Sequence, residues 1–245
     1  MLRFIVNAVL VFFFLIFTLP LMGIFWLMGR GKARDFGSLR VVQCAFKMVT
    51  YFSGTKVTII GEENIPDEPV LYIANHRSIF DIILTYSRVK RLTSYVAKDS
   101  LEKIPLLAQW MKLLHCLFLN RENPKEGLKT ILTAIEHIKT GISVCIFPEG
   151  GRNKGEELSM LPFKDGAFKI STKTNCAIIP MSINNTNYIF EEQFPRIKRT
   201  HVVIEYGKPI YPNSLPAPDK KRVGSYVQKI IQDTINKNSV LLGEA

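Results

Sequence analysis

A histidine and an aspartate lie five residues apart, directly after a stretch that is typical of a buried strand. The stretch is residues 70–74 (VLYIA), and the pair is His76 and Asp81 in the sequence NHRSIFD. Ser78 and Asp81 have the spacing of a capping box, which predicts a helix over residues 79–86. Two residues five apart on one helix point about 140° apart, but a histidine in the preceding turn is within reach of a first-turn carboxylate. Such a carboxylate would fix the tautomer of the imidazole and favour its protonated form, as a general base requires.

A simpler interpretation is that Asp81 only caps the helix and His76 is an ordinary turn residue. A second cluster of residues favours a catalytic role for the pair instead. Residues 142–147 (ISVCIF) form another apolar run, which ends in PEGGRN at residues 148–153. Proline stops the strand, the paired glycines let a ligand approach the backbone, and Arg152 offers a planar fork of donors suited to phosphate. Alone, this cluster is more often a surface turn, so the prediction depends on both clusters occurring together.

Together the clusters resemble the first and third motifs of the glycerolipid acyltransferase family, most closely the bacterial 1-acyl-sn-glycerol-3-phosphate (lysophosphatidate) acyltransferases. FLNR, ending at Arg121, resembles the second motif, which ends in a phosphate-binding arginine, and IIP at residues 178–180 resembles the fourth. Residues 98–105 (KDSLEKIP) and 161–168 (LPFKDGAF) are also similar to the family. The ordered set covers roughly residues 70–185 and is far more specific than a lone HxxxxD.

The sequence departs from the family pattern at two positions. His115 stands where the second motif usually has glycine, and Gly151 stands where the third usually has threonine or serine. The first departure bears on the shape of the loop that carries the arginine. The second removes a hydroxyl contact to substrate.

The resemblance implies transfer of a fatty acyl group from an acyl thioester to the 2-hydroxyl of 1-acyl-glycerol-3-phosphate, giving phosphatidic acid for phospholipid synthesis. The substrate hydroxyl attacks directly, so the protein must supply a base, oxyanion stabilisation and positioning rather than a nucleophile. The implied co-substrate is acyl-CoA or acyl-acyl carrier protein, with no bound cofactor. The implied site residues are the base His76 with its orienter Asp81, the phosphate ligands Arg121, Arg152 and Lys98, and the substrate contacts Glu149 and Gly150. The predicted partner of Glu149 is the polar backbone of the substrate or an arginine that it braces.

Other functions are open at this stage. The same chemistry could acylate a different lysolipid. A serine hydrolase is disfavoured because the sequence has no GxSxG elbow to carry a nucleophile. A non-catalytic, membrane-associated lipid-binding protein gives no reason for a base, its orienter and two motif arginines to occur together.

The chain is strongly basic, with a formal net charge of +11. A membrane surface with anionic lipid is the expected partner, because no helix-turn-helix, zinc-finger or aromatic RNA-binding motif supports nucleic acid. The four histidines show no metal-ligand spacing, which predicts no metal site. The cysteines are widely spaced and have no CxxC pair, which predicts buried free thiols in a reducing compartment. They are Cys44, Cys116, Cys145 and Cys176.

The N-terminal 53 residues are predicted to form a membrane-anchoring two-helix unit. Residues 4–28 are almost wholly apolar and long enough to span a hydrocarbon core of roughly 30 Å. Pro20 and Gly23 should bend this run, so insertion into one leaflet is an equal alternative. A cleaved signal peptide is disfavoured by the length of the run and by the lack of a small-residue cleavage site. The basic residues 30–34 (RGKAR) predict a cell-membrane location with the catalytic domain on the cytoplasmic face.

Residues 54–245 are predicted to form an α/β domain, in which helices flank a mixed, largely parallel sheet. An amphipathic helix from residue 35 to about 52 should lead into it. Both leading motifs follow strands, so the site should lie at the carboxyl ends of the strands. The predicted strands are residues 56–60, 70–74, 94–97, 117–119, 142–147, 177–183 and 202–206.

Two further helices are predicted within this domain. One begins at Asn123, with Pro124 at its first position and Glu126 completing a capping box. Its expected buried stripe is Leu128, Ile131, Leu132, Ile135 and Ile138. The other is a closing amphipathic helix over residues 219–237.

Overall fold

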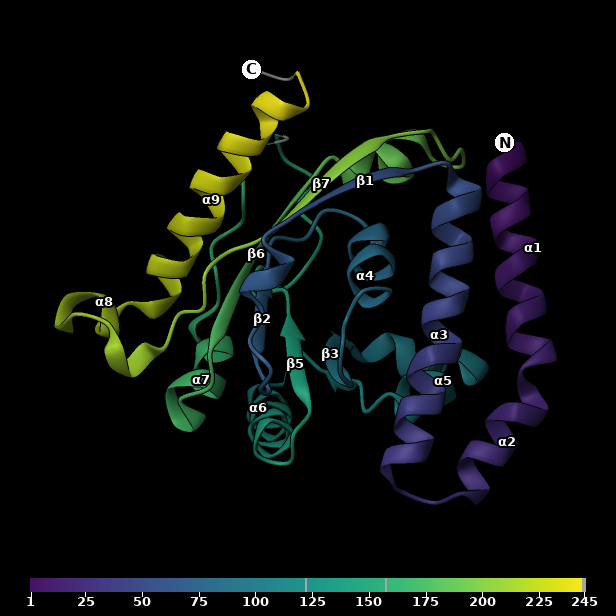
Figure 1. Ribbon diagram of the computed structural model, residues 1–245, viewed down its shortest axis with the longest axis horizontal. Helices are drawn as coiled ribbons and strands as arrows, with labels where there is room; N and C mark the ends of the chain where they lie inside the picture. The colour runs from purple at the N-terminus through teal and green to yellow at the C-terminus, as the bar shows by residue number, and fades with distance from the viewer. Residues whose placement is uncertain (122, 157, 244–245) are drawn as a thin grey trace.

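A seven-stranded sheet forms the centre of the part that the computed structural model describes, residues 1–121, 123–156 and 158–243 (Figure 1). Its strand order is β1-β7-β6-β2-β5-β3-β4, and all neighbours are parallel except β6 and β7. The predicted mixed, largely parallel sheet is therefore confirmed, and each predicted strand end is within one residue of the observed one. The strands are β1 (Lys56–Ile60), β2 (Leu71–Ala74), β3 (Thr93–Lys98), β4 (Leu117–Leu119), β5 (Ser143–Ile146), β6 (Ile178–Asn184) and β7 (His201–Tyr206).

Helices cover both faces of the sheet, as the strand alternation requires. Tyr72 of β2 points into the core beneath α3 (Lys32–Ser53), α4 (Ile79–Tyr86) and α5 (Pro105–Leu113). Its neighbour Leu71 points into the opposite core, beneath α6 (Pro124–Lys139), α7 (Lys169–Thr174) and α9 (Val223–Leu241). In Figure 1 the first group lies to the right of the sheet, and α7 and α9 lie to its left.

The predicted break in the N-terminal apolar run is confirmed. Helices α1 (Leu2–Phe17) and α2 (Leu19–Leu27) meet at Thr18 with a bend of 44°. Pro20 lies in the first turn of α2, where its missing N–H costs no helical hydrogen bond. Among the described residues, no single helix has the length and composition to cross a membrane, whereas the bent pair α1–α2 meets both criteria together.

The predicted boundary near residue 53 falls in the short link between α3 and β1. Leu39, Val42 and Val49 of α3 are buried in the same core as Leu84 of α4, so the N-terminal helices pack directly on the α/β part. The division into two domains stays a prediction.

The buried stripe of α6 is narrower than predicted. Ile131, Ile135 and Ile138 are buried, but Leu128 and Leu132 are 53% and 54% exposed. At 100° per residue, these two leucines are turned about 90° or more from the centre of the buried face, so the prediction was wrong for them. Asn123 caps the helix by accepting from the N–H groups of Lys125 and Glu126.

The closing helix is interrupted, whereas one helix over residues 219–237 was predicted. Helix α8 (Ala217–Lys221) ends at Arg222, whose backbone is not helical, and α9 starts at Val223. A Cβ at Gly224 would lie 2.8 Å from Asp165 and 3.2 Å from Phe168, so α9 begins in close contact with the loop before α7. The non-helical backbone of Arg222, with φ −131° and ψ 43°, separates the two helices.

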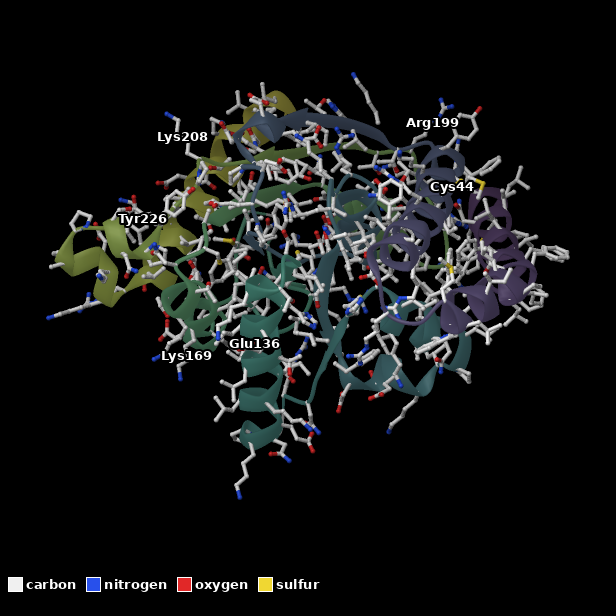
Figure 2. All side chains as sticks on the ribbon, turned by 60° about the horizontal axis from the view of Figure 1, so that its bottom comes forward. Cys44, Glu136, Lys169, Arg199, Lys208 and Tyr226 are labelled. Carbon is white, nitrogen blue, oxygen red and sulfur yellow. The ribbon has the colours of Figure 1, made fainter. Side chains whose placement is uncertain are left out.

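The cysteines are free, as predicted, but not all are buried. Cys145 and Cys176 are buried, Cys116 is half-buried, and Cys44 is exposed on the outer side of α3 (Figure 2). The prediction was therefore wrong for Cys44. Its side chain lies on the α3 surface next to Arg40 and Met48, away from the buried stripe of that helix.

Candidate active site

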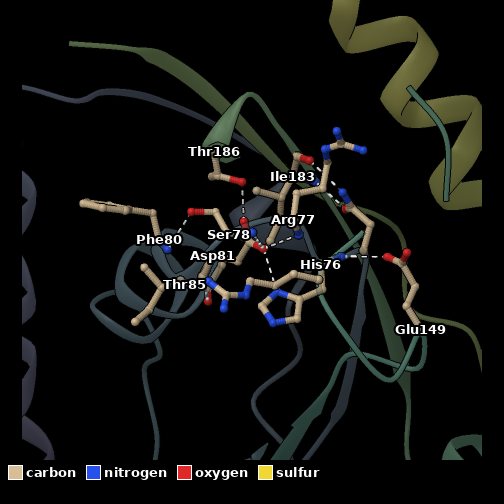
Figure 3. A network of polar contacts seen from close by, with 12 residues as sticks. His76, Arg77, Ser78, Phe80, Asp81, Thr85, Glu149, Ile183 and Thr186 are labelled. Atoms are coloured by element: carbon tan, nitrogen blue, oxygen red, sulfur yellow. Dashed lines mark hydrogen bonds and ion pairs between the residues drawn. The ribbon is translucent and has the colours of Figure 1, made fainter. Parts of the chain in front are cut away.

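His76 and Asp81 are in direct contact in the turn between β2 and α4. His76 Nδ1 lies 2.8 Å from Asp81 Oδ2 (Figure 3). The same oxygen accepts from the backbone N–H groups of Arg77 at 2.7 Å and Ser78 at 2.8 Å, completing the predicted capping box. Asp81 therefore caps the helix and contacts the histidine at once. Because a carboxylate can only accept, Nδ1 carries the proton and Nε2 is left as the basic nitrogen.

The backbone around His76 is fixed on both sides. The Asn75 side chain exchanges two hydrogen bonds with the backbone of Ile183, each 2.8 Å long, which joins the end of β2 to β6. The carbonyl of His76 accepts from the N–H of Asn153 at 2.7 Å. The imidazole lies against the Phe147 ring, with centroids 4.2 Å apart. These contacts define the orientation of the imidazole before any ligand binds.

Glu149 braces the backbone of the histidine. Its carboxylate accepts from the N–H of His76 at 2.7 Å (Figure 3). It also accepts from the N–H of Leu161 at 2.8 Å. Burial raises the pKa of Glu149, and these two backbone donors oppose that rise. The side chain is buried, and both its oxygens are used by backbone groups, which differs from the predicted contact with substrate or an arginine. Gly150, by contrast, lines the cavity described below, and its φ of +75° favours glycine.

Thr186 completes the surroundings of Asp81 and was missed in the sequence. Its hydroxyl donates to Asp81 Oδ1, the oxygen that His76 does not use (Figure 3). Glu191, a few residues later, contacts Ser78, Ile79 and Arg152. Both residues follow β6, whose carboxyl end is at the same edge of the sheet as that of β2. The strand pattern alone could have directed attention to this segment.

A cavity of about 780 Å³ opens beside His76. It passes over the carboxyl edge of the sheet, from Ile79 and Ile82 of α4 on one face to Leu128 and Ile131 of α6 on the other. Its lining includes the cations Lys98, Arg121, Arg152, Lys154, Lys164 and Lys169, and no carboxylate side chain of the described residues. A ligand with negative charge is therefore favoured.

The predicted phosphate ligands all lie on this cavity. Lys98 comes at the end of β3, and Arg121 follows the end of β4. Burial lowers the pKa of Arg121, an effect that nearby Asp99 opposes. Arg152 follows β5, and its side chain is 48% exposed and pairs with Glu191 at 2.8 Å. The structure thus gathers His76, Lys98, Arg121, Gly150 and Arg152 around one cavity, with Asp81 and Glu149 buried behind them.

His115 adopts a backbone conformation that favours glycine, which gives a physical meaning to the first departure from the family pattern. Its φ is 57°, in the left-handed region. Its Nε2 lies 3.0 Å from Asp35 Oδ1 and 3.0 Å from Arg34 Nη2. The side chain thus joins the start of β4 to α3. At the second departure, a Cβ on Gly151 would lie 3.7 Å from Arg121, so a larger residue there would border the arginine.

Three of the four cysteines are poorly suited to act as nucleophiles. Burial raises the pKa of Cys116 to about 11 and also raises the pKa values of Cys145 and Cys176, so these thiols stay protonated at neutral pH. Within the described part of the chain, no group of three or more His, Cys, Asp or Glu side chains is placed to hold a metal ion.

Comparison with known proteins places this geometry in a family. The model of the acyltransferase family matches residues 56–184, just over half of the chain. The chain is 30% identical over 189 residues to the 1-acyl-sn-glycerol-3-phosphate acyltransferase of Saccharomyces cerevisiae, covering 77% of this chain and 61% of the yeast protein. It is 28% identical to the protein of that name from Borreliella burgdorferi, covering 82% and 78%. It spans 58% of a relative of the same name from Cocos nucifera.

The fold has also been seen before. A crystal structure of the 1-acyl-sn-glycerophosphate (LPA) acyltransferase PlsC from Thermotoga maritima superposes with a TM-score of 0.75, at 24% identity, covering 96% of this chain and 97% of that one. The ordered motifs, the matching fold and the family model agree with one another. The chain belongs to the acyltransferase family.

Proposed function

We propose that this protein transfers a fatty acyl group from an acyl thioester to the 2-hydroxyl of 1-acyl-glycerol-3-phosphate, giving phosphatidic acid for phospholipid synthesis. The observation that carries the proposal is the 2.8 Å contact between His76 and Asp81 at the edge of a cavity lined by cations. The names of the relatives support the choice of acceptor, since the yeast and Borreliella proteins are both 1-acyl-sn-glycerol-3-phosphate acyltransferases.

In the proposed reaction His76 handles a single proton. Nε2 of His76 takes the proton of the 2-hydroxyl while the hydroxyl oxygen attacks the carbonyl carbon of the thioester. This attack forms a new C–O bond and leaves an oxyanion on the former carbonyl oxygen. The intermediate then collapses, the C–S bond breaks, and the imidazolium returns the proton to the leaving sulfur as a thiol. Asp81 stabilises the imidazolium between these steps, and a base positioned in this way contributes roughly 10²–10⁴ in rate.

The phosphate of the acceptor is assigned to Arg121, Arg152 and Lys98. Guanidinium groups can make bidentate, charge-assisted hydrogen bonds to phosphate, and Lys98 adds a third positive charge on the same lining. The 2-hydroxyl is only a few bonds from the phosphate, so fixing the phosphate also places the hydroxyl beside His76.

The acyl donor is assigned to the opposite end of the cavity, on the α6 face of the sheet. Leu128 and Ile131 offer apolar contacts there. Lys164 and Lys169 add positive charge beyond that of the three residues assigned to the acceptor phosphate. Acyl-CoA and acyl-acyl carrier protein both present the acyl group as a phosphopantetheine thioester, which combines an apolar acyl chain with an anionic phosphate. Either would suit this combination of side chains.

A membrane association through α1 and α2 is part of the proposal. Large apolar side chains of α1 are exposed, among them Phe12, Phe13 and Phe17. The basic residues 30–34 follow, so we propose a cell-membrane location with the α/β part on the cytoplasmic face. Membranes washed with high salt should retain the protein, and detergent should release it. Release by salt alone would contradict apolar insertion.

The function is tested with purified full-length protein in mixed micelles. Lysophosphatidate is offered with acyl-CoA and, separately, with acyl-acyl carrier protein, while lysophosphatidylcholine and lysophosphatidylethanolamine compete as acceptors. The expected product is phosphatidic acid from one or both donors. Preferential acylation of another lysolipid would contradict the assigned acceptor but agree with the proposed acyl transfer. The absence of any acyl transfer would contradict the proposal as a whole.

A further inference from the structure

Glu191 joins two parts of the site that lie far apart in the sequence. It lies in a short 3-10 turn (Glu191–Gln193) after β6, outside every motif recognised in the sequence. Its Oε2 accepts from the Ser78 hydroxyl at 2.5 Å, and its Oε1 accepts from the Ile79 N–H at 2.9 Å. The same Oε1 accepts from Arg152 Nη1 at 2.8 Å. One carboxylate therefore connects the start of α4 to the arginine that follows β5.

We propose that Glu191 is a positioning residue for acceptor recognition, which acts by holding the guanidinium of Arg152 beside the start of α4. This rests on the proposed function, in which Arg152 binds the acceptor phosphate. Arg152 has a long side chain that is 48% exposed, whereas the side chain of Glu191 is only 20% exposed. The more buried carboxylate thus orders the more exposed arginine.

The start of α4 makes Glu191 a firm anchor. A carboxylate at a helix N-terminus is stabilised by the helix dipole and by the backbone N–H groups that have no partner inside the helix. Ser78, the N-cap of α4, adds a hydroxyl donor. The position of Glu191 is therefore set by α4, the helix that also carries Asp81, and Arg152 is placed relative to the same helix.

The contact leaves most of the guanidinium available for a ligand. Glu191 uses Nη1, so the edge formed by Nε and Nη2 can still face a phosphate and bind it through two parallel hydrogen bonds. The negative charge of Glu191 opposes phosphate binding by simple repulsion. We infer that ordering of Arg152 outweighs this repulsion, and the sign of the change in KM decides between the two effects.

Two variants of the full-length protein distinguish the effect of the negative charge of Glu191 on Arg152 from the effect of its contacts with the start of α4. Glu191→Ala removes every contact, whereas Glu191→Gln keeps an oxygen that can accept from Ile79 but loses the charge that holds Arg152. Both should raise KM for lysophosphatidate roughly tenfold, with KM for the acyl donor within about twofold and kcat within about threefold of wild type. Glu192→Ala removes the same charge from the neighbouring exposed residue and serves as the matched control, with unchanged kinetics. Melting temperatures report on folding.

A double-mutant cycle with Arg152→Ala shows whether Glu191 acts through the arginine. In the Arg152→Ala background, removing Glu191 should change KM for lysophosphatidate by less than about twofold. Independent, multiplicative effects would overturn the proposal, as would a lower KM in Glu191→Gln or a loss confined to kcat. Wild-type protein that acylates no lysophosphatidate would instead refute the proposed function. Wild type that acylates it normally, with Glu191 variants that match wild type, would refute this inference alone.

Discussion

The proposed catalytic pair and the cation-lined wall of the cavity are built in opposite ways. Asp81 is fully buried and accepts hydrogen bonds from His76, Arg77, Ser78 and Thr186. Arg152 is 48% exposed and is held through one oxygen of Glu191. The proposed base is held through a buried carboxylate with four donors, whereas the arginine assigned to the phosphate is held at one nitrogen and keeps its other donors for a ligand. The proposed function needs both, because a base must be preorganised and a phosphate ligand must offer several donors.

Removing the base should give the largest effect. His76→Ala should lower kcat by roughly 10²–10⁴, because it removes the proposed acceptor of the hydroxyl proton. Melting temperature should change little, since the side chain borders a cavity and Asp81 keeps its three other hydrogen-bond donors. Near-normal turnover by a folded His76→Ala protein would contradict the assignment of the base.

Altering the orienter should give a smaller but substantial loss. Asp81→Asn should lower kcat by about 10–10², because a neutral amide cannot stabilise the imidazolium. Unlike His76→Ala, it should also lower the free energy of unfolding by about 1–3 kcal/mol, since a buried acceptor of several N–H groups is replaced. A variant with reduced stability and unchanged kcat would show that Asp81 is only a helix cap.

Variants in the cation-lined wall of the cavity should change KM rather than kcat. Arg121→Lys and Arg152→Lys should each raise KM for lysophosphatidate by roughly tenfold or less, because lysine cannot copy a bidentate contact. KM for the acyl donor should stay nearly constant. Phosphate-free monoacylglycerol is the control acceptor. Equal use of both acceptors by wild type and variants would mean that the arginines do not recognise phosphate.

The smallest expected effect is on the free energy of unfolding at acidic pH. It arises at a histidine outside both the proposed catalytic pair and the cation-lined wall. Burial lowers the pKa of His137 to about 4, and nearby His115 adds to the shift. The unfolded chain therefore takes up this proton first, near pH 6.5, so stability falls as the pH drops from about 6.5 towards 4. Between pH 7 and 5 the contribution should be about 1 kcal/mol, discounted because the ring is partly exposed.

Urea unfolding at pH 7 and pH 5 measures this contribution. His137→Leu should lose less stability than wild type over that interval. An equal loss in the two proteins would show that His137 is not responsible. Acyl transfer at pH 7 should be the same in both, because His137 is not part of the proposed site.

The sequence was most informative where one local signal determines one local structure. Apolar runs bounded by turn residues predicted the strands, and Ser78 with Asp81 predicted both the start of α4 and the contact to His76. Lys98 and Arg121 were identified through the family resemblance, and the rule that parallel strands gather their carboxyl ends at one edge explains why they lie on the same cavity as Arg152. The strands and the start of α4 needed only short-range spacing.

Partners distant in the sequence were not predictable in this way. Thr186 and Glu191 contact Asp81 and Ser78 across more than a hundred residues, and nothing in the local pattern specifies those pairs. Glu149 was recognised as a site residue, but its partners are backbone N–H groups, which every residue type carries except proline. Leu128 was assigned to the core because an apolar residue at helical spacing looks the same whether it faces a core or a cavity.

The reversal of direction between β6 and β7 has a consequence for how such a site can diverge. Because the two strands are antiparallel, with Asn184 opposite Val203, the link between them begins and ends at the edge of the sheet that carries the site. A parallel connection would have to leave that edge and return from the far side. Beyond Glu191, residues of this link can therefore be gained or lost without disturbing the strand register or the contacts of Thr186 and Glu191 with the start of α4. If the proposed function holds, we expect this link to be where acceptor preference can change while the sheet stays the same.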